Sequence, residues 1–140
     1  MEIKGFFGPY RFLSNFWLCP VEYEGRGYTS TEAAYQASKV SPETAHLRDQ
    51  FIGLAPGKAK RVGRRIPIRN DWEQIKFKVM LDLQRVKYQD AGLKTMLLAT
   101  GGAYLEETNT WGDEIWGVCN GKGKNALGKL IMQVRKEISK

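Results

Sequence analysis

The sequence predicts an α+β fold: a compact, mainly helical single domain, residues 1–140, with short β-strands. Three observations lead to this prediction. Apolar residues recur at helical spacing in several segments, most clearly in residues 72–86 and 126–138. Residues 16–30 have the aromatic and β-branched composition of a β-hairpin. The length of 140 residues, of which 42% are hydrophobic and 26% charged, suits one core.

The first half of the chain begins with this hairpin, whose turn is expected around Gly25 and Gly27. Thr29 and Glu32 then match a T-x-x-E capping box, which opens a helix that continues to about Val40. A serine followed by proline at 41–42 begins another helix that ends near residue 53. A short basic helix is expected over 56–65.

The second half is predicted to be mostly helical. Asp71 caps a long helix, and another helix over 91–99 stops at the sequence TGG. Residues 103–119 form short strands or loops, and Asn125 caps the last helix. The apolar face of the long helix is expected to comprise Ile75, Phe77, Val79, Met80, Leu81, Leu83 and Val86. That of the last helix comprises Leu127, Leu130, Ile131, Val134 and Ile138.

Composition and charge limit the classes of function. The net charge of +7 favours anionic ligands such as phosphates, nucleotides or nucleic acid. No apolar run is long enough to cross a bilayer, and the N-terminus does not resemble an export signal, so we expect a cytoplasmic protein with no membrane partner. Cys19 and Cys119 are expected to be reduced thiols. With a single histidine and no paired cysteine motif, neither a metal site nor a cofactor is expected.

The helix expected after the hairpin carries a polar stripe. Glu32, Gln36 and Lys39 are spaced at i, i+4 and i+7, with Tyr35 beside them, and mostly alanines occupy the opposite side. In one interpretation Glu32 completes the capping box and the stripe is solvated. In the other the stripe lines a pocket, where a desolvated Lys39 has a lowered pKa and acts as a nucleophile.

The segment TWGDEIWG, residues 110–117, places two tryptophans on either side of a carboxylate. Trp111 and Trp116 are either core anchors or an aromatic wall, beside Asp113, on which a base or a sugar face stacks. Trp72 has the same two interpretations at the start of a helix. Basic segments such as residues 57–65 form either a solvated face or contacts to phosphate.

Two further segments are candidates for ligand contact. In CNGKGKNALG, residues 119–128, glycines lead into a helix N-terminus next to Lys122 and Asn125, which is either a plain glycine turn or a phosphate site. In RFLSNFW, residues 11–17, Ser14 and Asn15 either end a turn or direct polar groups into a pocket.

An ordered set of motifs extends over essentially the whole chain. It consists of FLSNF at 12–16, STEAAYQASK at 30–39, Trp72 with Lys76 and Met80, TGGAYLEET at 100–108, D-x-x-W-G at 113–117 and NALGKLIMQVR at 125–135. Together these motifs resemble the YbiA-like or NADAR family. The resemblance implies a small α+β protein that acts as an N-glycosidase. Some members cleave phosphoribosylamino-pyrimidine intermediates of riboflavin synthesis, and others remove ADP-ribose from guanine bases.

On the matching positions, the resemblance implies that Glu32, Lys39 and Asp113 are catalytic and lie in one cleft with Trp116. It also implies a substrate pocket that includes Ser14, Asn15, Phe16, Trp72, Glu106 and Trp116. Gln36, Trp111, Lys122 and Asn125 complete the set of candidate substrate contacts. The carboxylates would stabilise an oxocarbenium-like sugar and activate water, and Lys39 would capture C1′ as a Schiff base.

The expected function is therefore hydrolysis of a ribosyl C–N bond in a phosphorylated N-riboside. The first alternative is removal of ADP-ribose from guanine, with nucleic acid as the carrier of the modified base. The second is a binding module for ADP-ribose or NAD that does not cut its ligand. A nucleic-acid binder driven by charge is a further rival, and it would show steep salt dependence.

Overall fold

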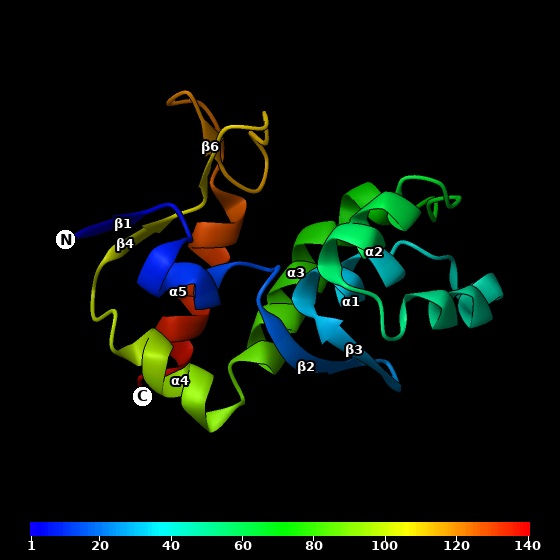
Figure 1. Ribbon diagram of the computed structural model, residues 1–140, viewed down its shortest axis with the longest axis horizontal. Helices are drawn as coiled ribbons and strands as arrows, with labels where there is room; N and C mark the ends of the chain where they lie inside the picture. The colour runs from blue at the N-terminus through cyan, green and yellow to red at the C-terminus, as the bar shows by residue number, and fades with distance from the viewer. The chain divides into compact units, whose positions relative to one another are not determined.

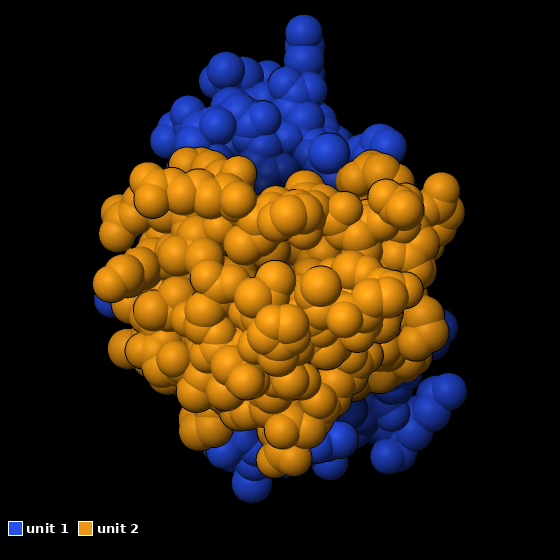
Figure 2. All heavy atoms as spheres, turned by 90° about the vertical axis from the view of Figure 1, so that its right-hand side faces the viewer, with its two compact units in different colours: residues 1–14, 88–140 blue, residues 15–87 orange.

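Helices make up most of the regular structure, and every strand is short. The computed structural model describes residues 1–140. Internal contacts divide the chain into two units, coloured separately in Figure 2: unit 1 comprises residues 1–14 and 88–140, and unit 2 comprises residues 15–87. The predicted α+β class, mainly helical with short strands, is confirmed.

Unit 2 opens with the predicted hairpin (Figure 1). Strands β2 (Leu18–Tyr23) and β3 (Arg26–Ser30) pair in antiparallel register. Its turn lies at Glu24 and Gly25, which have φ angles of 48° and 80°. Two consecutive positive φ angles are typical of the tight turns that match the twist of hairpin strands.

Four helices follow the hairpin in unit 2. They are α1 (Thr31–Ala37), η2 (Pro42–Phe51), α2 (Pro56–Gly63) and α3 (Trp72–Lys87). Segment η2 is a 3-10 helix interrupted by non-helical dihedral angles at Thr44, so the chain is kinked there. Helix α1 packs against α2, α3 and the hairpin, so it occupies the centre of the unit.

The buried face of α3 differs from the predicted one. Phe77 is 38% exposed, and Ile75 and Val86 are only half-buried. Instead, the buried positions include the polar Lys76, Gln84 and Lys87, together with Trp72, Val79, Met80 and Leu83. The predicted face was therefore partly wrong. The prediction used the spacing of hydrophobic residues alone, so it missed polar side chains that are buried, such as Gln84, which hydrogen-bonds to Asn15.

Unit 1 is built around a parallel strand pair and the last helix (Figure 1). Strand β1 (Glu2–Lys4) pairs with β4 (Tyr104–Glu106), and α5 (Ala126–Ile138) packs against β4. The approach of α5 requires Gly128, since a Cβ there would lie 2.2 Å from the backbone oxygen of Leu105. The short helices η1 (Gly8–Leu13) and α4 (Ala91–Leu98) complete the unit.

The buried stripe of α5 largely matches the prediction. Leu127, Ile131 and Val134 are 3%, 0% and 0% exposed, whereas Leu130 is half-buried. Asn125 stands at the predicted N-cap position, although its side chain makes no capping hydrogen bond. Strands β5 (Thr108–Asn109) and β6 (Val118–Cys119) form a second parallel pair in the region predicted to hold short strands or loops.

None of the helices combines the length and the apolar character that crossing a membrane requires.

Candidate active site

The start of α1 differs from the predicted capping box. Ser30 is the N-cap residue, and its hydroxyl oxygen accepts a hydrogen bond from the backbone N–H of Ala33 at 3.1 Å. Thr29 instead donates its hydroxyl hydrogen to the carbonyl of Leu54 at 2.6 Å. The capping box was therefore wrong, and Glu32 lies in the first turn of the helix without the capping role assigned to it.

The polar stripe of α1 is buried rather than solvated. Glu32 is 9% exposed and Gln36 is 4% exposed. The amide Nε2 of Gln36 donates to Oε2 of Glu32 at 2.6 Å. Because the alanine face of α1 is buried as well, both sides of this helix are withdrawn from solvent. A carboxylate kept in such surroundings and hydrogen-bonded to a neighbour is typical of a functional site.

Lys39 follows the last turn of α1 and is half-buried. Its Nζ lies 5.4 Å from the centre of the Tyr35 ring. Burial lowers the pKa of Lys39, and the positive charges of Arg64, Lys60 and Lys76 lower the pKa further, whereas Glu32 acts in the opposite direction. A lowered pKa increases the fraction of neutral amine near neutral pH, which is the nucleophilic form.

The FLSNF segment holds the N-terminal end of α1. The backbone carbonyl of Asn15 accepts a hydrogen bond from the N–H of Glu32 at 3.0 Å. The Asn15 side chain accepts from Nε2 of Gln84 at 2.8 Å and donates to the sulfur of Met80 at 3.6 Å. Asn15 thus positions the backbone of Glu32 and is itself held by two buried residues of α3.

Aromatic rings surround this group in unit 2. Trp72 is 5% exposed, and its ring centre lies 5.2 Å from that of Tyr35 with a tilt of 57° between the planes. Phe16 is 42% exposed, and Nζ of Lys60 lies 5.9 Å from its ring centre. Trp72 is therefore a packing residue of α1 and α3, while Phe16 leaves part of its ring accessible.

The remaining predicted site residues belong to unit 1. Oδ1 of Asp113 accepts hydrogen bonds from the backbone N–H groups of Ile115 and Trp116, at 3.1 and 2.9 Å. Its own N–H donates to Oδ1 of Asn109 at 3.0 Å. Asp113 therefore shapes the loop that carries Trp116, which is half-buried, while Trp111 is 63% exposed.

Glu106 is 8% exposed at the end of β4. It accepts hydrogen bonds from the hydroxyl groups of Thr108 and Tyr104, at 2.6 and 3.2 Å. Ser14 is half-buried at the end of η1, and its N–H donates to the carbonyl of Arg11 at 3.0 Å. Thr108 and Tyr104 were not among the predicted residues.

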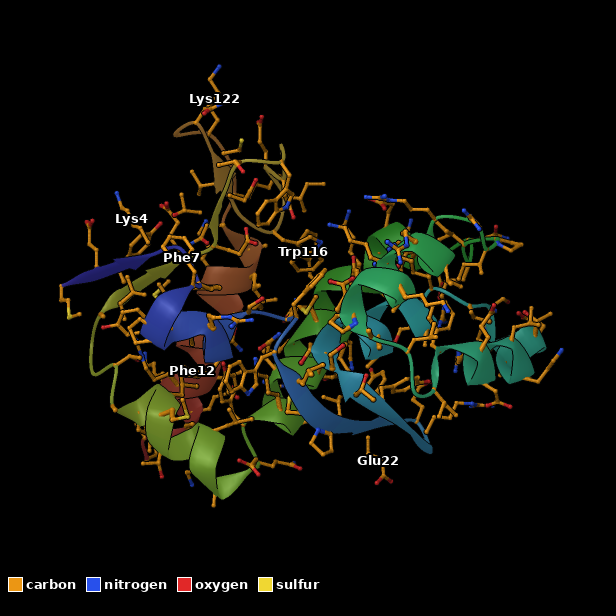
Figure 3. The ribbon with its side chains drawn as sticks, viewed as in Figure 1. Lys4, Phe7, Phe12, Glu22, Trp116 and Lys122 are labelled. Carbon is orange, nitrogen blue, oxygen red and sulfur yellow. The ribbon has the colours of Figure 1, made fainter.

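The glycine-rich loop before α5 carries two of the predicted substrate contacts, Lys122 and Asn125, and they lie in different surroundings. Lys122 extends outward from the tip of this loop, away from the rest of unit 1 (Figure 3). Asn125 is instead 2% exposed, and its amide donates to the carbonyl of Leu105 at 2.9 Å and accepts from the N–H of Glu107 at 3.0 Å. Asn125 thus joins the start of α5 to β4.

The structure adds residues that the sequence did not single out. Gly63 lies against Gln36, because a Cβ at this glycine would be 1.9 Å from Oε1 of Gln36. Lys60, Arg64 and Lys76 act electrostatically on Lys39. The buried face of α3 could have been predicted from a spacing of four residues in the sequence. This spacing relates Trp72, Lys76, Met80 and Gln84, all of which are buried.

A buried carboxylate, a lysine of lowered pKa and adjacent aromatic rings on a small α+β scaffold are features typical of an enzyme site. The chain belongs to the NADAR family, whose domain model matches residues 5–139.

Relatives within this family support the assignment. The N-glycosidase YbiA of Escherichia coli is 37% identical over 131 residues, covering 91% of this chain and 81% of the relative. An N-glycosidase of Nostoc punctiforme is 32% identical, covering 93% and 86% of the two chains. A riboflavin biosynthesis protein of Vibrio vulnificus is 34% identical over 91% of this chain and 35% of its own length.

A solved structure supports the fold in the same way. The NMR structure of E. coli YbiA matches with a TM-score of 0.84 and 34% identity, over 99% of this chain and 87% of the other. The chain is accordingly an enzyme of the N-glycosidase class within the NADAR family.

Proposed function

We propose that this N-glycosidase hydrolyses the ribosyl C–N bond of a phosphorylated N-riboside, namely a phosphoribosylamino-pyrimidine of the kind formed in riboflavin synthesis. The name of the Vibrio vulnificus relative supports this substrate class. We place the reaction in the cytoplasm, a compartment in which free thiols such as Cys19 and Cys119 stay reduced.

One observation carries the mechanism: a half-buried lysine of lowered pKa follows directly after a short helix that carries a buried glutamate, and the charge of this glutamate acts on the lysine. A ribosylamine opens to an imine at C1′, which is a target for an amine nucleophile. Nζ of Lys39 attacks C1′ and forms a new C–N bond, after which the bond from C1′ to the departing amine breaks. Glu32 carries the proton released from Nζ to that amine, and water then hydrolyses the lysine imine.

Phe16 and Gln36 have supporting roles in this proposal. The accessible part of the Phe16 ring supplies a surface on which the pyrimidine stacks. Gln36 keeps the Glu32 carboxylate oriented through its hydrogen bond of 2.6 Å.

Borohydride tests the covalent step. Added during turnover, it reduces the lysine imine to a stable secondary amine, and mass spectrometry of peptides is expected to locate the adduct on Lys39. Lys39→Arg keeps the positive charge but has no usable free amine, so turnover is expected to be lost. Lys58→Arg, an exposed lysine on α2, serves as the matched control.

The outcome separates two mechanisms. If no adduct forms and Lys39→Arg still turns over, Lys39 is an electrostatic contact and the Glu32 carboxylate activates water directly. If a panel of ribosylamino-pyrimidines releases no free base, the proposed substrate is wrong.

Removal of ADP-ribose from guanine is the second candidate, favoured by the net charge of +7. A guanine attached to nucleic acid would bring many phosphates to the protein, so turnover would fall steeply with salt. A free metabolite would give a weak dependence on salt. ADP-ribosyl-guanine in free and oligonucleotide-linked form, assayed beside the ribosylamino-pyrimidines, distinguishes these substrates.

A further inference from the structure

Helix α2 carries cations that have no carboxylate partner. Several basic side chains elsewhere in unit 2 form ion pairs: Arg26 with Asp49, Arg48 with Glu24, Arg69 with Asp71, Lys76 with Glu73 and Lys78 with Asp82. Lys60 and Arg64 form no such pair. Unpaired cations beside a buried site are the usual receptor for an anionic ligand.

The packing of α2 determines which of its cations face the site. Pro56, Ala59 and Gly63 are its buried residues, and Gly63 contacts the Gln36 side chain of α1. At about 3.6 residues per turn, Lys60 and Arg64 share the side of α2 next to this contact. Lys58 and Arg61, which are both exposed, share the other side.

Two further contacts bring Lys60 close to the proposed chemistry. Its Nζ lies 5.9 Å from the centre of the Phe16 ring, in the segment whose Asn15 carbonyl binds the N–H of Glu32 at 3.0 Å. Lys60 and Arg64 are also among the main positive charges that act on Lys39.

We propose that Lys60 and Arg64 bind the phosphate of the substrate, a phosphate ester on the 5′ oxygen of the ribose, and so hold C1′ near Lys39. This inference rests on the proposed function and specifies its substrate: an N-riboside without a phosphate is a poor substrate. Arginine offers two parallel N–H donors to a phosphate, and Lys60 adds a second charged donor from the preceding turn.

The test compares four variants with the same change in charge. Lys60→Met and Arg64→Met are expected to raise KM for the phosphorylated riboside by about tenfold or more, the loss expected for a hydrogen bond between charged groups. The KM of the dephosphorylated riboside should stay unchanged. Lys58→Met and Arg61→Met are matched controls on the other side of α2 and should leave both values unchanged.

A direct binding measurement separates this inference from the reaction itself. Ribose 5-phosphate and inorganic phosphate are titrated into the protein, and their binding is followed by amide chemical shifts. Saturable shifts that are lost in Arg64→Met and kept in Arg61→Met support the phosphate site, even if no riboside is cleaved. If Lys60→Met fails to fold, Arg64→Met decides alone, since Arg64 is exposed.

Two results would overturn the phosphate site. Equal effects in all four variants would show a dependence on net charge only. Unchanged KM values in Lys60→Met and Arg64→Met, in a protein that does cleave the phosphorylated riboside, would leave the proposed reaction standing without this site.

Discussion

At the scale of single residues, the chemistry depends on how the side chain of Glu32 is held. Its carboxylate accepts from Gln36 at 2.6 Å, and its N–H donates to Asn15 at 3.0 Å. Gly63 leaves room for the Gln36 side chain, which a Cβ would approach to 1.9 Å. The orientation of the carboxylate therefore depends on two backbone positions outside α1 as well as on the helix.

Glu32→Gln is expected to lower kcat by about 10²–10⁴-fold, the usual contribution of a proton-transfer group. Binding of ribose 5-phosphate should be retained, because the cations of α2 are untouched. The Glu32 charge raises the pKa of Lys39, so its removal should also shift borohydride trapping to lower pH. Steady-state kinetics and a pH series of trapping check both effects. Turnover equal to that of the unaltered protein would remove Glu32 from the reaction.

Lys87 is expected to give the protein an unusual dependence of stability on pH. Burial lowers its pKa from 10.5 to about 8, partly opposed by the charge of Cys19. Between these two values the unfolded chain holds a proton that the folded chain has released. The free energy of unfolding should therefore rise with pH through this window and fall as pH drops toward 8.

Urea denaturation across the same pH window measures this slope in the unaltered protein and in Lys87→Met. The variant removes the titrating group, so its slope should be smaller. Burial raises the pKa values of Tyr23 and Tyr28, so these residues make the free energy of unfolding fall with pH in the same window. Their effect is the same in both proteins and therefore cancels in the comparison. Identical slopes in the two proteins would mean that Lys87 is protonated in the folded state.

At the scale of elements, α5 anchors unit 1 through a buried face that meets β4. Gly128 allows the backbones to approach, and Arg135 donates hydrogen bonds to the Thr100 hydroxyl at 2.9 Å and the Ala103 carbonyl at 2.8 Å. Helix α5 therefore holds the segment that leads into β4 and Glu106.

Ile131→Ala is expected to lower the free energy of unfolding by about 2–5 kcal/mol, because Ile131 is fully buried and its loss leaves a cavity. Leu130→Ala is the matched control on the adjacent position. Leu130 is only half-buried, so its truncation should cost clearly less. Denaturant unfolding of both variants measures the difference, and equal losses would contradict the burial pattern of α5.

At the scale of the whole molecule, we propose that residues 1–140 unfold as one domain, as the length of the chain suggests. Tryptophans report on each unit separately: Trp17 and Trp72 lie in unit 2, and Trp111 and Trp116 in unit 1. Two variants each keep the tryptophans of one unit and carry Trp→Phe at the two positions of the other unit. The denaturant midpoints measured by fluorescence of the two variants should coincide. Two separate midpoints would show that the units unfold independently.

We also expect the reaction to need no metal ion. The sequence has one histidine and two distant cysteines, and the structure groups no three histidine, cysteine, aspartate or glutamate side chains into a metal site. Turnover should therefore be the same before and after dialysis against a chelator. Activity that is lost in the chelator and restored by a divalent ion would contradict this expectation.

The sequence by itself determined the family, the hairpin, the order of the helices and the polar stripe of α1. These features are local: turn glycines, helical spacing and short motifs express them without reference to distant residues. It also predicted Glu32 and Lys39 as site residues, since both stand in one short motif, STEAAYQASK.

Only the tertiary structure decided which of two adjacent hydroxyls caps α1 and which polar residues are buried. The sequence predicted Thr29 as the cap, but the Ser30 hydroxyl accepts from the N–H of Ala33, while the Thr29 hydroxyl is directed to the carbonyl of Leu54, a residue distant along the chain. Lys76, Gln84 and Lys87 look like solvated positions until their long-range surroundings are known. The assignment of the α2 cations to a phosphate site likewise depends on the contact between Gly63 and Gln36. Burial and the local electrostatic surroundings of a side chain depend on its neighbours in space, which the sequence does not show.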